Sequence, residues 1–339
     1  MDVSVRAAGI DCGTNSIRLL IADVDPEAGT LRSVERLMRI VRLGQGVDAT
    51  GRLAPEAIAR AVATVADYAA RCAELGVEEI RMVATSATRD ASNASDFSQA
   101  IREILGRAPE IADGAEEAAL SFAGAATAIV SPHPILAVDL GGGSTELVLG
   151  MAPPPHAHDG GAPGVLASFS MDVGCVRMTE RHLRSDPPTP AEVAAAASDV
   201  DAWLDKAGRV VDLGATRTLV GLAGSVTTLA AFALDLHSYD PLAVHGSVFL
   251  VDDMLSACRR MWEMPRAAIA ALGTVQVGRA DVIAGGALVW SRVIERVRAA
   301  TRASGHPLSH VTVSEHDILD GITMTAAARA HTRGRSPLP

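Results

Sequence analysis

The amino-acid sequence predicts an α/β protein of two related halves, each built on a mixed sheet flanked by helices. Three observations support this prediction. The chain has 339 residues, which is too long for one ordinary core and a natural length for two domains. A glycine-rich motif occurs twice, 128 residues apart. After each copy, segments with the apolar spacing of helices and of strands alternate.

The repeated motif is the strongest organising feature of the sequence. Residues 9–21 read GIDCGTNSIRLLI, and residues 137–149 read AVDLGGGSTELVL. The matched positions are Asp11 with Asp139, Gly13 with Gly141, and Ser16 with Ser144. Each copy is an apolar run, a glycine-rich turn and a second apolar run, which is typical of a β-hairpin. Two copies at domain spacing indicate paired domains that begin with the same hairpin.

The remaining elements follow in order along the chain. After its hairpin, the first half predicts a strand over 30–42, a helix over 55–75, a strand over 79–85 and helices over 93–105 and 114–128. The second half predicts strands near 135–139, 145–151 and 165–171, helices near 175–184 and 190–207, a strand over 216–222, helices over 225–234, 252–262 and 279–300, a strand over 310–314 and a last helix over 316–330. Prolines at 132 and 134 break the chain between the halves, so we expect domains over 1–128 and 129–315. The low-complexity segment 152–164 predicts a loop.

Composition excludes several classes of protein. Hydrophobic residues make up 48% of the chain and charged residues 21%, which excludes a disordered protein. No apolar stretch approaches the roughly 18 residues that cross a bilayer, so we expect no membrane contact. The N-terminal residues lack a leader-like apolar region, which favours a cytoplasmic protein. A net charge of −10 and 3% aromatic residues argue against nucleic acid as a partner.

The two hairpin turns have the composition of an anion-binding site. Glycines in a tight turn leave backbone N–H groups unshielded, and successive N–H groups form a concave nest for anions. The candidate phosphate-binding residues in the turns are Gly13, Thr14, Asn15, Ser16, Gly141, Gly142, Gly143, Ser144 and Thr145. Asp11 and Asp139 would repel phosphate alone but become useful where Mg²⁺ bridges the two. The alternative is a plain glycine-rich hairpin in which aspartate forms the turn.

Three further segments contribute candidate residues. Glu116 and Glu117 open a predicted helix, and adjacent helical residues diverge by about 100°, so we expect only one to face a site. Alternatively, both glutamates have only a structural role, because negative side chains interact favourably with the positive end of the helix dipole at its N-terminus. Arg89 lies between a predicted strand and a predicted helix. At this position it either binds phosphate or is a surface arginine without a ligand. Gly224 and Ser225 lie at the start of another predicted helix. The N-terminus of this helix could bind phosphate, and Ser225 is expected to cap the helix.

Motifs of other phosphate-binding and hydrolytic classes are absent from the sequence. There is no GxxxxGK[ST] and no GxGxxG that opens a helix, which excludes P-loop and Rossmann proteins. GxSxG and HExxH are absent as well.

Taken together, these motifs resemble those of the exopolyphosphatase/guanosine-pentaphosphate phosphohydrolase (Ppx/GppA) family, within the actin-like, sugar-kinase-like ATPase superfamily. The resemblance runs from Gly9 to about Gly321 and includes ATSATRDASN (84–93), GAEEA (114–118) and RADVIAGGAL (279–288). It implies two RNase H-like domains with the active site in the cleft between them, and a homodimer. It also implies that the last helix packs back toward the first domain. The chain resembles the short, two-domain branch of the family.

By the same resemblance, roles fall on particular residues. The glutamate before Ala118, which is Glu117, is expected to be the catalytic base. Asp139 and Glu146 are expected to hold Mg²⁺, or Mn²⁺ in its place, largely through water and with help from Asp11. Phosphate is expected to bind Asn15, Ser16, Arg89 and the 141–145 loop.

The expected reaction is Mg²⁺-dependent hydrolysis of the terminal phosphoanhydride of inorganic polyphosphate, of short to medium chain length, with release of orthophosphate. Because pppGpp ends in the same bond, a pppGpp 5′-phosphohydrolase or a slow (p)ppGpp-binding sensor is the alternative. A kinase of the same superfamily is a further alternative. A polyphosphate groove on a chain of net charge −10 would need clustered arginines such as Arg89 and Arg279.

Overall fold

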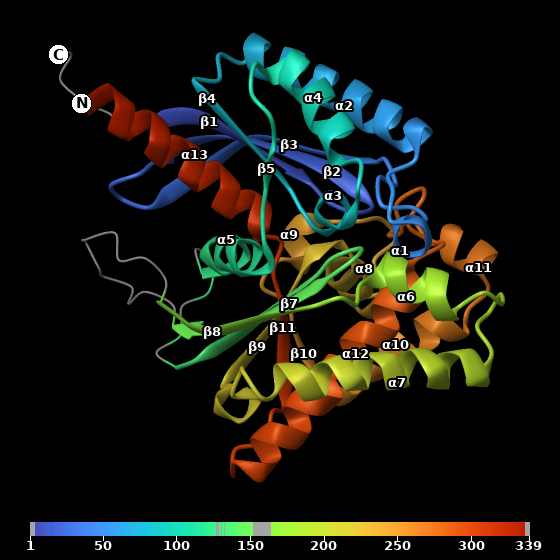
Figure 1. Cartoon of the computed structure of the whole chain (residues 1–339). Helices are drawn as coiled ribbons and strands as arrows, with labels where there is room; N and C mark the ends of the chain where they lie inside the picture. The colour runs from blue at the N-terminus through green and yellow to red at the C-terminus, as the bar shows by residue number, and fades with distance from the viewer. Residues whose placement is uncertain (1–3, 127–128, 130, 132, 152–163, 336–339) are drawn as a thin grey trace. The chain divides into compact units, whose positions relative to one another are not determined.

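The computed structural model describes residues 4–126, 129, 131, 133–151 and 164–335, and the chain divides into two compact units (Figure 1). The first unit holds the chain up to residue 126 and again from Ile318, and the second holds 133–151 and 164–317. Apart from Gly164, the predicted 152–164 loop lies outside the described residues. None of the described helices is long and apolar enough to cross a membrane.

The first unit is built on a five-stranded sheet with the order β3-β2-β1-β4-β5. Its strands are β1 (Val5–Cys12), β2 (Ser16–Asp25), β3 (Thr30–Ile40), β4 (Glu79–Ala84) and β5 (Glu110–Ile111). The first three form an antiparallel meander, while β4 and β5 extend the sheet from β1 in parallel. The four longer strands confirm the predicted pattern, whereas β5 is too short to leave a periodic apolar signal.

Helices cover both faces of this sheet. They are α1 (Val47–Thr50), α2 (Pro55–Glu74), α3 (Ser86–Asp90), α4 (Ala94–Leu105), α5 (Gly114–Ala126) and α13 (Ile318–Arg335). On one face, α2 and α4 bury Tyr68, Phe97 and Ile101 in a core shared with β1 and β2. On the other face lies α13, the last helix of the chain, with α5 packed beside it. The first unit is therefore completed by residues from both ends of the sequence.

Glycines allow α13 to lie close to its neighbours. A Cβ atom on Gly9 of β1 would lie 2.9 Å from the backbone nitrogen of Thr323. A Cβ atom on Gly321 would overlap the backbone carbonyl group of Leu120 in α5. Because the opposing atoms are backbone, they cannot turn aside as a flexible side chain would.

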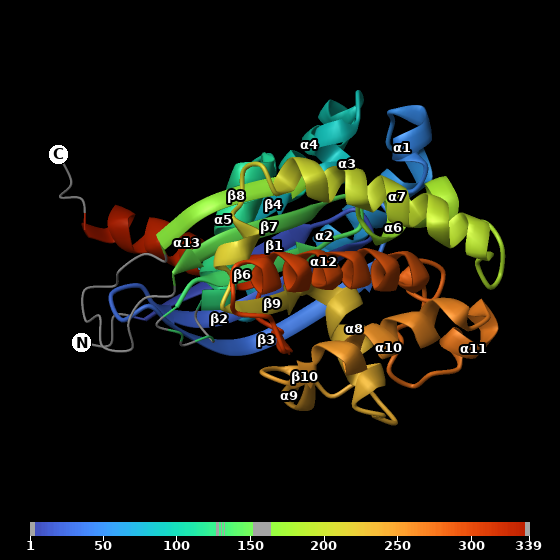
Figure 2. The ribbon, with the colours of Figure 1, turned by 90° about the horizontal axis from the view of Figure 1, so that it is seen from below.

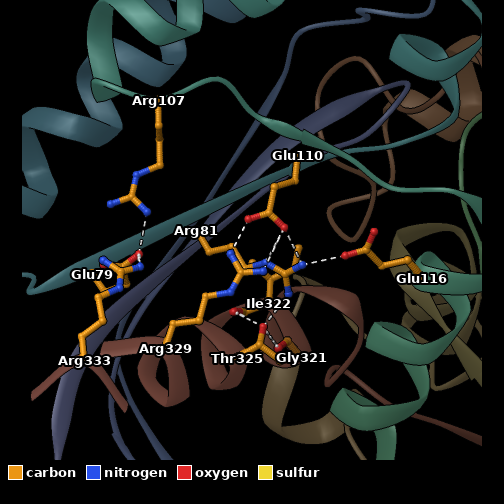
Figure 3. Close-up of polar contacts among 10 residues, drawn as sticks. All are labelled: Glu79, Arg81, Arg107, Glu110, Glu116, Gly321, Ile322, Thr325, Arg329 and Arg333. Carbon is orange, nitrogen blue, oxygen red and sulfur yellow. Dashed lines mark hydrogen bonds and ion pairs between the residues drawn. The ribbon is translucent and has the colours of Figure 1, made fainter. Parts of the chain in front are cut away.

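Two groups of polar contacts join α13 to the sheet (Figure 3). In one group, Glu79 of β4 forms ion pairs with Arg107 and with Arg333 of α13. In the other, the Arg81 network, Arg81 of β4 has a side chain that is only 4% exposed and donates to Glu110 of β5, Glu116 of α5 and Thr325 of α13. Arg329 of α13 also donates to Glu110. The buried charge of Arg81 is thereby compensated, which a buried guanidinium requires.

The second unit is built on a six-stranded sheet with the order β10-β11-β9-β6-β7-β8. Its strands are β6 (Ile135–Leu140), β7 (Thr145–Met151), β8 (Gly164–Met171), β9 (Thr218–Leu222), β10 (Val248–Leu250) and β11 (His310–Val313). β6, β7 and β8 form an antiparallel meander, and β9 and β11 run parallel to β6. β10 is an additional antiparallel edge strand that the sequence pattern did not predict.

The core of the second unit is centred on one long helix. The helical elements are α6 (Cys175–His182), α7 (Pro190–Ala207), the 3₁₀ turn η1 (Leu213–Ala215), α8 (Ala223–Ala233), α9 (Pro241–Val244), α10 (Val251–Glu263), α11 (Arg266–Ala270) and α12 (Ile283–Ala303). α12 packs against α6, α7, α8 and α10 (Figure 2) and buries Trp290 completely. This helix begins at Ile283 rather than at the predicted residue 279.

The two sheets share one topology. Counted from the meander toward the parallel strands, the order is β3-β2-β1-β4-β5 in the first unit and β8-β7-β6-β9-β11 in the second. The same hydrogen bond closes both hairpin turns. Gly13 N donates to Ser16 O, and Gly141 N donates to Ser144 O, each at 3.0 Å. The sequence repeat is therefore a structural repeat, and the predicted pair of mixed sheets is confirmed.

We predict that Gly321→Ala destabilises the protein by about 1–3 kcal/mol, because the new methyl group must displace the Leu120 backbone. Chemical denaturation monitored by circular dichroism measures this loss. Gly164→Ala is the control, since a Cβ atom there meets no atom of the described residues within 4 Å. Equal stability of Gly321→Ala and the wild type would contradict the close packing of α13 on α5.

The network also predicts a pH dependence of stability. Hydrogen bonds from Arg329 and then Arg81 lower the pKa of Glu110 from 4.5 to about 2. A carboxylate whose pKa is lower in the folded state stabilises the protein above its unfolded pKa and loses that contribution as the pH falls.

We therefore expect the difference in unfolding free energy between the wild type and Glu110→Gln to shrink as the pH falls from about 4.5 to about 2. Urea unfolding at several pH values measures this difference. Glu103→Gln, an exposed change of the same charge on α4, is the control. A difference that stays constant over this pH range would show that Glu110 contributes no charge-dependent stability.

Candidate active site

The first hairpin turn is held through its carbonyl groups. The carbonyl oxygen of Thr14 accepts from Gly44 N at 2.8 Å, and that of Asn15 accepts from Val41 N and Arg42 N at 3.0 and 2.8 Å. The Thr14 hydroxyl lies 2.9 Å from the hydroxyl of Ser86 in α3. The Thr14 side chain is therefore used inside the protein, although its sequence position suggested phosphate binding.

The second turn is held in the same way by the first turn of α6. The carbonyl oxygen of Gly141 accepts from Cys175 N at 3.0 Å, and that of Gly142 accepts from Val176 N at 2.9 Å. The Gly143 carbonyl accepts from the Arg177 Nε at 2.8 Å. Gly174 makes this approach possible, because a Cβ atom there would overlap the Gly142 carbonyl group. The Thr145 hydroxyl donates to Val173 O at 2.7 Å and is likewise used inside the protein.

The backbone N–H groups of the turns are left as donors. Within the described part of the chain, the amides of Thr14 and Asn15 in the first turn have no acceptor. The same holds for those of Gly142, Gly143 and Ser144 in the second turn. Each turn thus presents an excess of hydrogen-bond donors, which is the property of an anion-binding nest.

The two hairpins differ in their charged pair. Asp11 stands opposite Arg18 in the ladder of β1 and β2, and its Oδ2 accepts from the Arg18 Nε and Nη2 at 2.9 and 2.7 Å. At the equivalent place in the second unit, Asp139 stands opposite Glu146. The Glu146 Oε1 accepts from the Ser170 hydroxyl at 2.7 Å. An Asp–Arg pair in one unit thus corresponds to an Asp–Glu pair in the other.

The Asp139–Glu146 pair has the donor chemistry that a hard cation requires. Like charges directly opposite on neighbouring strands repel, so a bound cation would stabilise them. Mg²⁺ is usually bound by one or two carboxylates while keeping several waters. Among the residues that the structure describes, no group of three or more His, Cys, Asp or Glu side chains gathers into a metal site. A metal at this pair would therefore take its remaining ligands from water or substrate.

Glu116 and Glu117 point to different arginines. The helix α5 is capped by Asp113, whose Oδ1 accepts from the backbone N–H groups of Ala115 and Glu116. The Glu116 Oε1 lies 2.7 Å from the Arg81 Nη2. The Glu117 Oε2 instead lies 3.1 Å from the Arg89 Nη1. The predicted divergence of these adjacent glutamates is therefore observed.

Arg89 and Glu117, which are 28 residues apart in the sequence, are brought together by the ends of β4 and β5. Arg89 lies in α3, directly after β4, and Glu117 follows β5. The Arg89 Nη1 also donates to the carbonyl oxygen of Ala112 at 3.0 Å, which fixes the guanidinium beside the carboxylate. Two of the candidate residues thus form one ion pair.

The expectation that Ser225 caps a helix is wrong. α8 begins at Ala223 and its N-cap is Leu222, so Ser225 lies inside the first turn. Ser225 hydrogen-bonds the thiol of Cys175, while burial raises the pKa of that thiol. The hydroxyl also packs at Gly286, where a Cβ atom would lie 2.6 Å from it. Ser225 therefore has a packing role that its sequence position did not indicate.

Gly224 provides space for an arginine. A Cβ atom on Gly224 would overlap the guanidinium of Arg279, so only glycine allows this arginine to lie over the start of α8. The sequence suggested that Gly224 contacts phosphate through its backbone. The structure shows that Gly224 also leaves room for a cationic side chain at the start of α8, and its contact with phosphate stays a prediction.

Sequence reasoning missed three polar residues that support the turns and carboxylates. They are Arg18, Ser170 and Arg177. The repeat contained a signal for Arg18, because it occupies the place of Glu146 when the two copies are aligned. Ser170 and Arg177 contact their partners only through the folded structure, so no local pattern reveals them.

Comparison with known proteins gives consistent matches over nearly the whole chain. The model of the Ppx/GppA phosphatase family matches residues 20–306. Proteins named Exopolyphosphatase 2 from two strains of Mycobacterium tuberculosis, CDC 1551 and H37Rv, are 50% identical over 330 residues. That match covers 95% of this chain and 98% of theirs.

Solved structures agree with these matches. One described as an exopolyphosphatase-like protein has a TM-score of 0.90 and 46% identity, and the match covers 96% of this chain and 98% of that one. A Ppx/GppA family member from Aquifex aeolicus has a TM-score of 0.75, 28% identity and the same coverage. An exopolyphosphatase from Cytophaga hutchinsonii, with a TM-score of 0.80 and 23% identity over the same shares, supports the fold alone.

The predicted fold, two RNase H-like α/β domains of the actin-like ATPase superfamily, is confirmed by these structures and by the two sheets described above. The family match extends over most of the chain, and it includes the second hairpin turn, the Arg89–Glu117 pair and the Asp139–Glu146 pair. The chain belongs to the Ppx/GppA phosphatase family.

Proposed function

We propose that this protein is an exopolyphosphatase that hydrolyses the terminal phosphoanhydride of inorganic polyphosphate and releases orthophosphate. The observation that carries the proposal is the polarity of the two hairpin turns. Their carbonyl groups accept hydrogen bonds from neighbouring segments, while the N–H groups of residues 14, 15 and 142–144 have no acceptor among the described residues. A chain of phosphates is an anion of the type that such turns bind. The 50% identity to proteins named Exopolyphosphatase 2 supports the same substrate.

In this proposal, Glu117 is the catalytic base. Its carboxylate orients a water molecule and takes a proton from it as the oxygen attacks the terminal phosphorus. The Arg89 guanidinium, whose Nη1 lies 3.1 Å from the Glu117 carboxylate, is the proposed cationic partner for the oxygens of that phosphate. The N–H groups of the first hairpin turn, which lies in the same unit as Glu117 and Arg89, would stabilise the negative charge that spreads over the phosphoryl oxygens.

Asp139 and Glu146 are the proposed residues for Mg²⁺, with Mn²⁺ as a substitute. A divalent ion bound there would neutralise charge on the phosphates and orient them. Asp11 has a smaller role in this proposal, because Arg18 already compensates its charge.

The substrate test compares phosphate release from polyphosphates of defined length, from pppGpp and from ATP. No phosphoryl acceptor is added, because a kinase would need one and a hydrolase uses water. We expect release from polyphosphate, with short to medium chains preferred. Faster turnover of pppGpp would reassign the chain as a pppGpp phosphohydrolase. Absence of phosphate release from all three would refute the proposed hydrolysis.

We predict that Glu117→Gln lowers kcat by about 10²–10⁴, because a positioned general base contributes about that much to the rate. KM for polyphosphate is expected to change little, since the glutamine side chain keeps the size of the base. Steady-state phosphate release measures both constants. Glu56→Gln, an exposed position in α2, is the matched control. Turnover by Glu117→Gln close to that of the wild type would rule out the assignment of the base.

Because Asp139 faces Glu146 whereas Asp11 faces Arg18, we predict that the two hairpins contribute unequally to the binding of a divalent metal. Asp139→Asn and Glu146→Gln are expected to weaken Mn²⁺ binding by about tenfold or more, because each removes one of two opposed carboxylates. Asp11→Asn is expected to weaken it less. Electron paramagnetic resonance of Mn²⁺ without substrate measures the affinity, and a Mg²⁺ titration of activity provides a second readout. Equal losses in the Asp11 and Asp139 variants would contradict the distinction between the hairpins.

A further inference from the structure

Glu116, the neighbour of the proposed base, is the end point of the ion-pair network around Arg81 (Figure 3). The Arg81 Nη2 donates to the Glu116 Oε1 at 2.7 Å and to the Glu110 Oε2 at 2.7 Å. The Arg81 Nη1 donates to the Thr325 hydroxyl at 2.7 Å. Arg81 is therefore held by partners on β5 and α13 in addition to its contact with α5. These partners make it a rigid anchor for Glu116.

The first turn of α5 needs such an anchor. Gly114 and Ala115 open the helix, and glycine gives up more conformational freedom than any other residue when it becomes ordered. The first N–H groups of a helix also lack intrahelical partners. Asp113 binds two of them through contacts that are local to the helix start, whereas the Glu116–Arg81 ion pair connects this turn to β4.

The orientation of Glu116 sets that of Glu117. Successive residues of a helix differ in direction by about 100°, so fixing one side chain fixes the rotation of the turn and the direction of the next side chain. With Glu116 held on Arg81, the Glu117 carboxylate lies beside Arg89. The two glutamates thus have separate partners on the two sides of the helix start.

We propose that Glu116 is a positioning residue for the reaction: its ion pair with Arg81 holds the first turn of α5 so that Glu117 stays beside Arg89. This inference rests on the proposed function of Glu117 as the base. It also gives α13 a part in the reaction, because Thr325 and Arg329 hold the Arg81–Glu110 pair to which Glu116 is attached.

Removing Glu116 is expected to leave the protein folded. Arg81 keeps Glu110 as a carboxylate partner, so its buried charge stays compensated. The Glu116 side chain itself is 43% exposed, so its loss opens no cavity in the core. A large effect of Glu116→Ala on the rate would therefore come from the orientation of the turn.

The kinetic test is a double-mutant cycle with Glu117. Glu116→Ala is expected to lower kcat by about tenfold while KM changes by less than about threefold. Glu116→Gln, whose amide oxygen still accepts from Arg81, should recover part of that loss. In the Glu117→Gln background, Glu116→Ala should change kcat by less than about twofold, because a residue that acts only through the base has nothing left to position.

The matched control is Glu79→Gln. Glu79 is a β4 residue like Arg81, its side chain is 4% exposed, and it accepts from Arg107 and Arg333 in a separate group of ion pairs. These partners lie on α13 and on the segment before β5 rather than on α5. This variant should lower thermal stability and leave kcat within about twofold of the wild type. The proposal is overturned if Glu116→Ala turns over like the wild type. It is also overturned if Glu116→Ala costs the same factor with and without Glu117.

Hydrogen exchange tests the same inference without substrate. The amides of residues 115–118 should exchange about tenfold faster in Glu116→Ala and at the wild-type rate in Glu79→Gln. Unchanged exchange in Glu116→Ala would refute the anchoring of the turn. Failure of the proposed function gives a different result, in which the wild type releases no phosphate while the exchange measurement still decides the role of Glu116.

Discussion

Two hairpin turns with an excess of hydrogen-bond donors organise the elements around them. Their carbonyl groups attach neighbouring segments: residues 41–44 join the first turn, and the start of α6 joins the second. Gly174 must lack a side chain for α6 to come this close. The same bonds that hold these segments in place occupy the acceptors and leave the N–H donors. Structural attachment and the proposed anion binding would therefore be two results of one hydrogen-bond pattern.

The internal repeat also gives two similar hairpins different charged pairs. In the first unit the aspartate before the turn faces an arginine, and in the second it faces a glutamate. A compensated carboxylate has little need of a metal, whereas two opposed carboxylates favour one. One of the differences between the copies, arginine or glutamate on the second strand, distinguishes an Asp–Arg pair from an Asp–Glu pair. The backbone geometry remains the same in both.

The sequence predicted the fold well because its signals are local. Hairpins show alternating apolar residues around glycine, and helices show the 3.6-residue period, so most elements and both mixed sheets could be predicted. The very short β5 and β10 carry too few residues for a period, and they were missed. Ser225 was misassigned because a serine near a helix start resembles a cap, whereas the helix begins two residues earlier.

Contacts at the candidate site were harder to predict, because they depend on long-range packing. Nothing local to Arg89 indicates that it lies against Glu117, since their meeting depends on the parallel pairing of β4 with β5. The direction of the Glu116 side chain depends on Arg81. Arg81 is itself oriented by Thr325 of α13, which lies 244 residues further along the sequence. Helical geometry alone predicted that the two glutamates diverge, but not which partner each one finds.

The position of α13 has a consequence for how the chain folds during synthesis. All the described strands of the second unit lie between the start of β6 and the end of β11, so they are available before α13 is translated. The first unit leaves the ribosome earlier but lacks the helix that covers Val5, Ala7 and Leu20 until the last segment emerges. Domains generally fold as units during synthesis, with the N-terminal one first. Here the order is reversed: the half that is translated first is the half that completes its core last.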